Sequence, residues 1–221
     1  SSGMLGPMTT QAITAGKRRY AAAAMAGVVI YAVVDIVLHL LPPHYNPISD
    51  AESNLAVGPF GWIMNLNFLG RAAMTFCLMA AVSRAGPATG LRRTGSWLLA
   101  VGGVCSGVLA FFSADIHAAG ASGLRVSTAE GTIHLYVAAF GFLAALAAFV
   151  LLTLWIRTSP QLRTAYPTAC AFTLLAGAGL ASLGITIGFA PELLGLAERI
   201  CLVGILGWAF AVAAAIRRSV P

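Results

Sequence analysis

Charged side chains are scarce in this chain. Of its 221 residues, 9% are Asp, Glu, Lys or Arg, whereas 59% are hydrophobic. A soluble globular domain carries about 25% charged residues, and an apolar surplus of this size cannot all be buried in one soluble core. The composition therefore excludes an ordinary soluble domain and predicts an integral membrane protein.

The chain also lacks the short motifs that accompany several kinds of catalysis. It contains no G-x-S-x-G, no Walker loop, no G-x-G-x-x-G and no C-x-x-C. These absences disfavour a serine hydrolase of the familiar kind, a nucleotide-binding loop and a paired-cysteine site. The cysteines all lie inside apolar runs, where a thiol behaves as a small buried hydrophobic group: Cys77, Cys105, Cys170 and Cys201.

Six apolar runs approach or reach the ~20 residues that a membrane-spanning helix needs. They cover residues 20–41, 60–82, 97–114, 133–156, 168–189 and 200–216. Their connections are short, so consecutive helices are expected to pack as antiparallel neighbours. The predicted fold is all-α, a single transmembrane bundle over residues 20–218. Residues 1–7 are interpreted as an expression-tag remnant, and residues 8–19 as a short N-terminal segment.

The basic residues predict how this bundle is oriented. They cluster at the N-terminal flank, in the second and fourth connections and in the C-terminal tail: Lys17, Arg18, Arg19, Arg84, Arg92, Arg93, Arg157, Arg163, Arg217 and Arg218. Cytoplasmic loops carry the excess of Lys and Arg in membrane proteins, so both termini are predicted to be cytoplasmic. The same distribution disfavours nucleic acid as the reason for the net charge of +6. Every carboxylate except Asp35 falls towards the opposite side, so any site is expected to face outwards.

Three polar segments carry a family resemblance. They are YNPISDAESNLAVGPFGW at 45–62, FFSADIHAAG with GTIHLYVAAFGF between 111 and 142, and GLAERICLVGILGW at 195–208. In this order they resemble the DUF998 family of six-helix membrane proteins from bacteria and archaea. The resemblance implies the fold and a location in the plasma membrane. It also matches the family's polar positions, which here are Ser49, Asp50, Asn65, Asp115, His134 and Arg199.

Asp35 and His39 lie four residues apart and therefore share one face of the first predicted helix. An ionisable group at membrane depth costs about 2.5–3.5 kcal/mol, so it faces the bundle interior and finds a partner. Arg71 in the second span is the expected partner of Asp35. The pair is either a structural lock or the charged wall of a pocket for a lipid headgroup, to which Asn65 and Arg199 are expected to contribute.

The stretch from 111 to 134 is unusually rich in ionisable residues, and three interpretations compete for it. Zinc accepts His and carboxylate ligands, which makes Asp115, His117 and His134 candidate metal ligands. Without a metal, Asp115 and His134 could act as general acid and base, with Asp50 brought to the rim by the preceding loop. The third interpretation is structural, because Asp115 ends one helix and Glu130 lies at the start of the next.

Two further expectations concern packing. The proline-rich loop at 42–59 is predicted to fold over the bundle, and Arg199, rather than its neighbour Glu198, is predicted to face the polar cluster. The spacings Gly103-x-x-x-Gly107 and Gly184-x-x-x-Gly188 favour close helix approach, either within the chain or in a homodimer.

The sequence thus predicts a multi-pass membrane protein with membrane lipids as its partners at the outer leaflet. It leaves open whether the protein is a lipid-modifying enzyme, by hydrolysis or acid–base chemistry, or a non-catalytic subunit that binds a lipid or a partner. An enzyme requires an apolar tunnel that reaches a solvated Asp/His pair. A structural cluster is filled by its own side chains.

Overall fold

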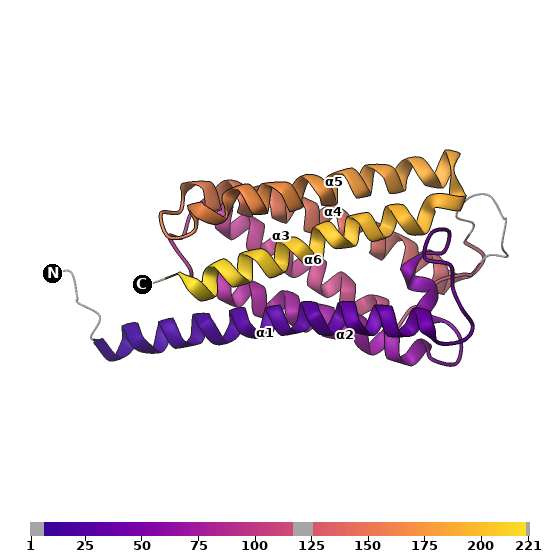
Figure 1. Cartoon of the computed structure of the whole chain (residues 1–221), viewed down its shortest axis with the longest axis horizontal. Coiled ribbons are helices and arrows are strands. Elements are labelled where there is room, and N and C mark those ends of the chain that lie inside the picture. Colours follow the sequence, from indigo (N-terminus) through magenta and orange to yellow (C-terminus); the bar gives the residue numbers. More distant parts are fainter. Residues whose placement is uncertain (1–6, 117–125, 220–221) are drawn as a thin grey trace.

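The computed structural model describes residues 7–116 and 126–219, and these form long helices that run alongside one another (Figure 1). No strand occurs among the residues described, which confirms the all-α prediction for them. The α-helices are α1 (Pro7–Leu40), α2 (Gly61–Val82), α3 (Gly90–Leu109), α4 (Ala129–Thr158), α5 (Tyr166–Phe189) and α6 (Leu194–Arg218). Three short 3₁₀ helices lie in the connections: η1 (Glu52–Ala56), η2 (Arg163–Ala165) and η3 (Pro191–Leu193).

Five of the described helices, namely α1, α2, α4, α5 and α6, are long and apolar enough to cross a membrane. The chain is therefore a multi-pass membrane protein. Two helices differ clearly from their predicted bounds. The helix α1 begins at Pro7 rather than at residue 20. The remaining helix, α3, begins at Gly90 rather than at residue 97 and ends at Leu109 rather than at 114. The Thr89 side chain caps it by accepting a hydrogen bond from the backbone of Arg92. The first turns of α3 are mostly polar, so a search for apolar runs does not detect them.

The six α-helices close into a ring. Each packs against the next helix along the chain, and α6 packs back against α1. The helix α6 also reaches across the interior to contact α2 and α4. Short connections at 83–89, 159–165 and 190–193 favour side-by-side packing of the helices that they join.

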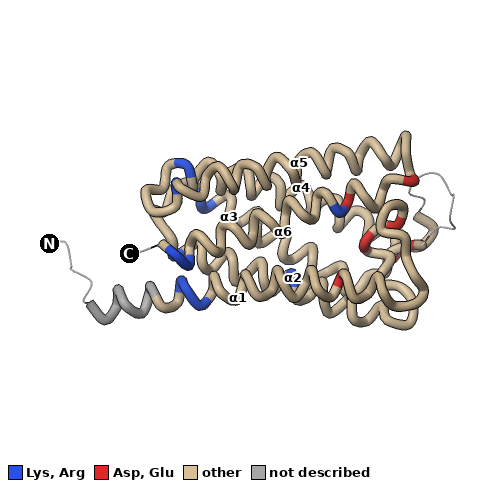
Figure 2. Tube along the Cα trace, in the orientation of Figure 1, with Lys and Arg blue, Asp and Glu red and all other residues tan. Residues whose placement is uncertain are grey.

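The two ends of the bundle differ in charge and in packing. Lys and Arg gather at the end where both chain termini lie, and the Asp and Glu residues lie towards the other end (Figure 2). We call these the basic end and the acidic end. A dense core fills the basic half, where Trp155 and Trp208 are fully buried and the Phe149 ring stacks on Trp208 with centroids 4.3 Å apart.

The loop between α1 and α2 folds over the acidic end, as predicted. The backbone N–H of Leu196 at the start of α6 donates to the carbonyl of Ile48, 2.9 Å away. Gly195 permits this approach, because a Cβ atom there would lie 2.3 Å from the carbonyl oxygen of Asp50. Within the loop, the Tyr45 hydroxyl donates to the Val57 carbonyl at 3.0 Å. The loop is therefore tied both to itself and to α6.

The glycine motifs have different roles in the structure. Gly103 and Gly107 of α3 face α2, where added Cβ atoms would lie 3.2 Å from Thr75 and 3.7 Å from Ala72, so this motif packs within the chain. Added Cβ atoms at Gly184 and Gly188 would meet nothing within 4 Å among the described residues. That motif makes no close helix contact inside the bundle. A homodimer through either face stays a prediction.

Candidate functional site

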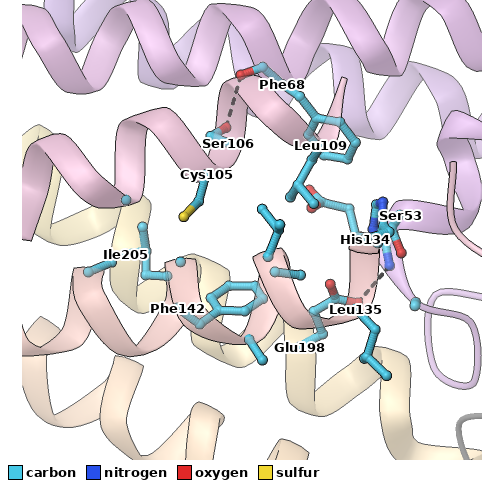
Figure 3. Close-up of a pocket in the computed structure, with 18 of the residues that line it drawn as sticks. Ser53, Phe68, Cys105, Ser106, Leu109, His134, Leu135, Phe142, Glu198 and Ile205 are labelled. Atoms are coloured by element: carbon cyan, nitrogen blue, oxygen red, sulfur yellow. Dashed lines mark hydrogen bonds between the residues drawn. The ribbon is translucent and has the colours of Figure 1, made fainter. Parts of the chain in front are cut away.

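A cavity of about 430 Å³ lies in the bundle among η1, α2, α3, α4, α5 and α6. Most of its wall is apolar, with Phe142, Leu183 and Ile205 among the lining side chains. In the close-up, His134, Ser53 and Glu198 lie towards one end of the cavity, and Cys105, Phe142 and Ile205 lie towards the other (Figure 3). The cavity is thus an apolar chamber with one polar end.

Arg71 is held at this polar end by two hydroxyl groups. Its Nε donates to Oγ of Ser106 at 2.8 Å, and its Nη1 donates to the Tyr31 hydroxyl at 2.9 Å. The guanidinium carbon also lies 5.1 Å from the centroid of the Tyr31 ring and 5.2 Å from that of Phe68, within cation–π range. Three neighbouring helices therefore fix one cation beside the cavity.

Glu52 reaches this cation from the loop. Its Oε1 accepts a hydrogen bond from the Tyr31 hydroxyl at 2.8 Å, and its Oε2 lies 3.8 Å from Nη1 of Arg71. The backbone N–H of Glu52 donates to Oε2 of Glu198 at 2.7 Å. Glu52 and Glu198 are both buried. The short helix η1 therefore places the Glu52 carboxyl group inside the bundle and gives the Glu198 carboxyl group a hydrogen bond from its backbone.

Burial raises the pKa of Glu52 to about 8, because desolvation penalises its charged form. Arg71 opposes this shift, and the nearby carboxylates of Glu198 and Asp35 reinforce it. At neutral pH the Glu52 carboxyl is therefore largely protonated. It can release or accept a proton near physiological pH, which an ordinary surface glutamate cannot do.

His134 projects into the cavity from the first turns of α4. Its Nδ1 lies 2.7 Å from the carbonyl oxygen of Phe112. Because a carbonyl only accepts hydrogen bonds, Nδ1 carries the hydrogen and Nε2 holds a lone pair. His134 is buried, with 4% of its surface exposed, and it lines the cavity. Its Nε2 is thus available as a proton acceptor.

Asp115 connects the end of the α3 segment to the start of α4. Its carboxylate accepts hydrogen bonds from the backbone and hydroxyl groups of Ser127 and Thr128, at distances of 2.7 to 3.3 Å. These bonds, led by the backbone N–H of Ser127, lower its pKa to about 2. A Cβ atom at Gly131 would lie 2.3 Å from this carboxylate. Asp115 lines the cavity, but as a permanently ionised cap it is poorly suited to proton transfer.

Arg199 contacts two members of the predicted polar cluster, His39 and Asp50, but it does not line the cavity. Arg199 points towards the loop, where Nη1 donates to the Asp50 carbonyl at 2.9 Å and Nη2 donates to Nε2 of His39 at 2.5 Å. Its neighbour Glu198 lines the cavity instead. Because a guanidinium only donates, Nε2 of His39 accepts, and its Nδ1–H bonds the Asp35 carbonyl at 2.8 Å.

The predicted pairing of Asp35 with Arg71 is wrong. Glu52 lies between the loop and α2 and takes the place of Asp35 as the ion-pair partner of Arg71. Oδ1 of Asp35 is buried and has no hydrogen-bond partner among the residues described. Asp35 therefore carries an unsatisfied oxygen near the cluster.

Asn65 and Asp50 lie away from the cavity. Asn65 is half-buried, and its neighbour Asn67 is the buried amide, which donates to the Tyr31 carbonyl at 3.1 Å. Asp50 shapes its own loop, since Oδ2 accepts from the Asn46 backbone at 2.8 Å and Oδ1 from the Ser49 hydroxyl at 3.1 Å. Neither Asn65 nor Asp50 is among the lining residues.

The family model described as "Protein of unknown function (DUF998)" matches residues 25–215 of the chain. The chain belongs to the DUF998 family. No curated protein and no solved structure matches it. The match confirms the resemblance carried by the three polar segments. The site of this DUF998 member must accordingly be interpreted from its own geometry.

The zinc prediction for this DUF998 chain stays a prediction. His117 lies outside the described residues, so its distance to Asp115 and His134 is not defined. Among the residues that the structure places, no group of three or more His, Cys, Asp or Glu side chains is arranged to hold a metal ion.

The pKa of Glu52 predicts how the stability of this DUF998 protein depends on pH. The folded-state value, about 8, lies above the ordinary value of 4.5. The stabilising contribution of Glu52 to the free energy of folding is therefore complete below pH 4.5, and it is lost as pH rises through about 8. The melting temperature is expected to fall between pH 5 and 9, and more steeply in the parent than in Glu52→Gln. The exposed Glu192→Gln is the control, and an equal slope in the parent and Glu52→Gln would contradict the assignment.

Proposed function

We propose that this protein binds a membrane amphiphile in the cavity, with the polar head at Arg71, His134 and Glu198 and the apolar chain along α3, α4 and α5. One observation carries the proposal: an apolar chamber of about 430 Å³ ends at a small set of convergent polar groups. Ligand sites have this composition, in which apolar walls provide affinity and a few polar groups fix orientation.

The charge distribution supports an orientation for this site. The end with the Lys and Arg clusters faces the cytoplasm by the positive-inside rule, and both termini lie there (Figure 2). The acidic end, with the loop and the polar part of the cavity, then lies at the outer leaflet. The host membrane in this proposal is the plasma membrane of a bacterium or archaeon.

The lining residues also support entry from the lipid phase. Leu143 of α4 is 57% exposed, and Gly184 of α5 is exposed as well, yet both line the cavity. The cavity therefore reaches the surface of the bundle between α4 and α5. A lipid chain can enter there sideways without crossing the polar loop.

A second candidate function is proton transfer to or from the bound amphiphile. It is favoured by the three titratable groups that line one apolar cavity: the protonated Glu52, the Nε2 lone pair of His134 and the carboxyl of Glu198. Together these provide an acid and a base at neutral pH. This candidate retains the lipid-modifying enzyme that the sequence predicts, with Glu52 and Glu198 in place of Asp115 and Asp50.

A substitution that fills the cavity tests the binding proposal. Gly184 has open space around its Cβ position and lines the cavity, so Gly184→Phe adds a ring at the wall of the chamber without a clash at Cβ. Lipid recovered with the purified protein, measured by native mass spectrometry, is expected to fall to background in this variant. Gly188→Phe is the matched control, because Gly188 also has open space, lies one turn away and does not line the cavity. Equal lipid occupancy in both variants would contradict the proposal.

A further inference from the structure

Two hydrogen-bond acceptors at the polar end of the cavity are left without a partner among the described residues. Oε2 of Glu198 accepts from the Glu52 backbone, whereas its Oε1 accepts no hydrogen bond from the described residues. Nε2 of His134 is likewise without a partner among them, because the hydrogen of this imidazole is on Nδ1. A ligand head that satisfies both groups must donate hydrogen bonds.

Two of the three guanidinium nitrogens of Arg71 already donate inside the protein. Nε and Nη1 of Arg71 donate to Ser106 and Tyr31, and the guanidinium is also held by Glu52 and by two aromatic rings. The hydroxyl of Ser106 donates in turn to the Phe68 carbonyl at 2.9 Å. An anionic head would therefore meet a guanidinium that is already shared with a carboxyl group and two hydroxyl groups of the protein.

Charge leads to the same conclusion. The described lining residues supply three carboxyl groups, from Glu52, Asp115 and Glu198, whereas Arg71 is the sole Lys or Arg among them. Even with Glu52 protonated, the carboxylates outnumber the cation. In an apolar chamber, where charges are weakly screened, a phosphate beside Glu198 would be repelled and a cation would be attracted.

We propose that the amphiphile bound in this cavity carries a protonated amine, whose N–H groups donate to Oε1 of Glu198 and Nε2 of His134. The inference rests on the proposed function, since it names the head of the molecule that the cavity binds. The same ammonium chemistry occurs in free long-chain amines and in aminophospholipids. Glu198 is the residue that discriminates heads by charge, and His134 supplies a neutral acceptor.

The test uses three probes with one chain length and different heads: hexadecylamine, hexadecanol and hexadecyl phosphate. Binding to the full chain in neutral nanodiscs is measured by displacement of a fluorescent fatty-chain probe. Hexadecylamine is expected to bind at least about tenfold more tightly than hexadecanol, as one charge-assisted hydrogen bond provides. Hexadecyl phosphate is expected to bind most weakly. Glu198→Gln should remove the amine preference, so that hexadecylamine and hexadecanol bind this variant with similar affinity.

The outcomes separate this inference from the proposed function. If hexadecanol or hexadecyl phosphate binds as tightly as the amine and Gly184→Phe abolishes the binding, the cavity holds an amphiphile and the amine assignment is overturned. If none of the probes binds in a manner sensitive to Gly184→Phe, the proposed function itself fails. The head-group comparison on the parent protein decides the question even if Glu198→Gln does not fold.

Phosphatidylethanolamine as a fourth probe identifies the source of the amine. If it competes with hexadecylamine, the ligand is an aminophospholipid, and if it does not, the ligand is a free amine.

Discussion

Replacing Arg71 with methionine is expected to destabilise the protein by about 3 kcal/mol or more, because it leaves a buried carboxyl cluster without its cation. Arg71 donates to Ser106 and Tyr31 and lies 3.8 Å from Glu52. Methionine keeps the apolar stem but loses all of these interactions. The loss is measured as a fall in melting temperature at pH 8, where more of the Glu52 carboxyl is ionised than at lower pH.

Asp35→Asn is the matched control for this experiment. Its Oδ1 is buried and lacks a hydrogen-bond partner in the described part of the chain, so an amide at this position gives up no hydrogen bond of that oxygen and costs little. The melting temperature of Asp35→Asn is expected to equal or exceed that of the parent. A large loss in Asp35→Asn together with a parent-like Arg71→Met would restore Asp35 as the structural partner that the sequence suggested. The double variant Arg71→Met with Glu52→Gln should recover part of the loss, because it removes the stranded carboxyl.

The second large effect is expected at the contact between α5 and α6. A Cβ atom at Gly179 would lie 2.3 Å from the backbone nitrogen of Cys201, and one at Gly204 would lie 2.4 Å from the backbone nitrogen of Ala176. Backbone atoms cannot move aside as a flexible side chain can. Gly179→Ala is therefore expected to force the helices apart and to lower stability by about 1–3 kcal/mol.

Gly184→Ala provides the comparison on the same helix. It adds the same methyl group at a position with nothing within 4 Å, and alanine has the higher helix propensity. Its melting temperature is expected to stay at or above the parent value. If both variants lost stability equally, the cause would be glycine-specific flexibility of α5 rather than its contact with α6.

The architecture could be predicted from the sequence because membrane helices require a distinctive amino-acid composition. Long apolar runs and basic clusters arise from the solvation of the whole chain, and they do not depend on which side chains meet. The start of α3 escaped detection because Arg92 and Arg93 lie inside its first turns. There the helix is defined by the Thr89 cap rather than by apolar periodicity.

The candidate site was predicted less well, since it depends on contacts between segments far apart in the sequence. Glu52 was one carboxylate among several polar loop residues, and only the fold of η1 shows that it enters the bundle. One available signal was overlooked. Glu198 lies three and four residues before Cys201 and Leu202, which are both buried, so helical periodicity places it on the inward face. Arg199, one residue later, is rotated towards the loop.

His134 lines the cavity, and its catalytic or metal-binding role stays a prediction. Asp115 matches the structural interpretation, because it caps the start of α4. Spacing alone could not distinguish a catalytic carboxylate from a cap, because both lie where one helix ends and another begins. The hydrogen bonds from Ser127 and Thr128 identify the cap. Local geometry thus decided what residue type and position could not.

The two halves of the bundle are packed to different densities. At the basic end, Trp155, Trp208 and Phe149 fill the space between α4 and α6, and this dense core resists deformation. At the acidic end, α4 and α5 flank a void and are not held together by their glycines. A small rotation about the dense core therefore widens the gap between these two helices most at the acidic end. The acidic end is thus expected to deform more easily than the basic end.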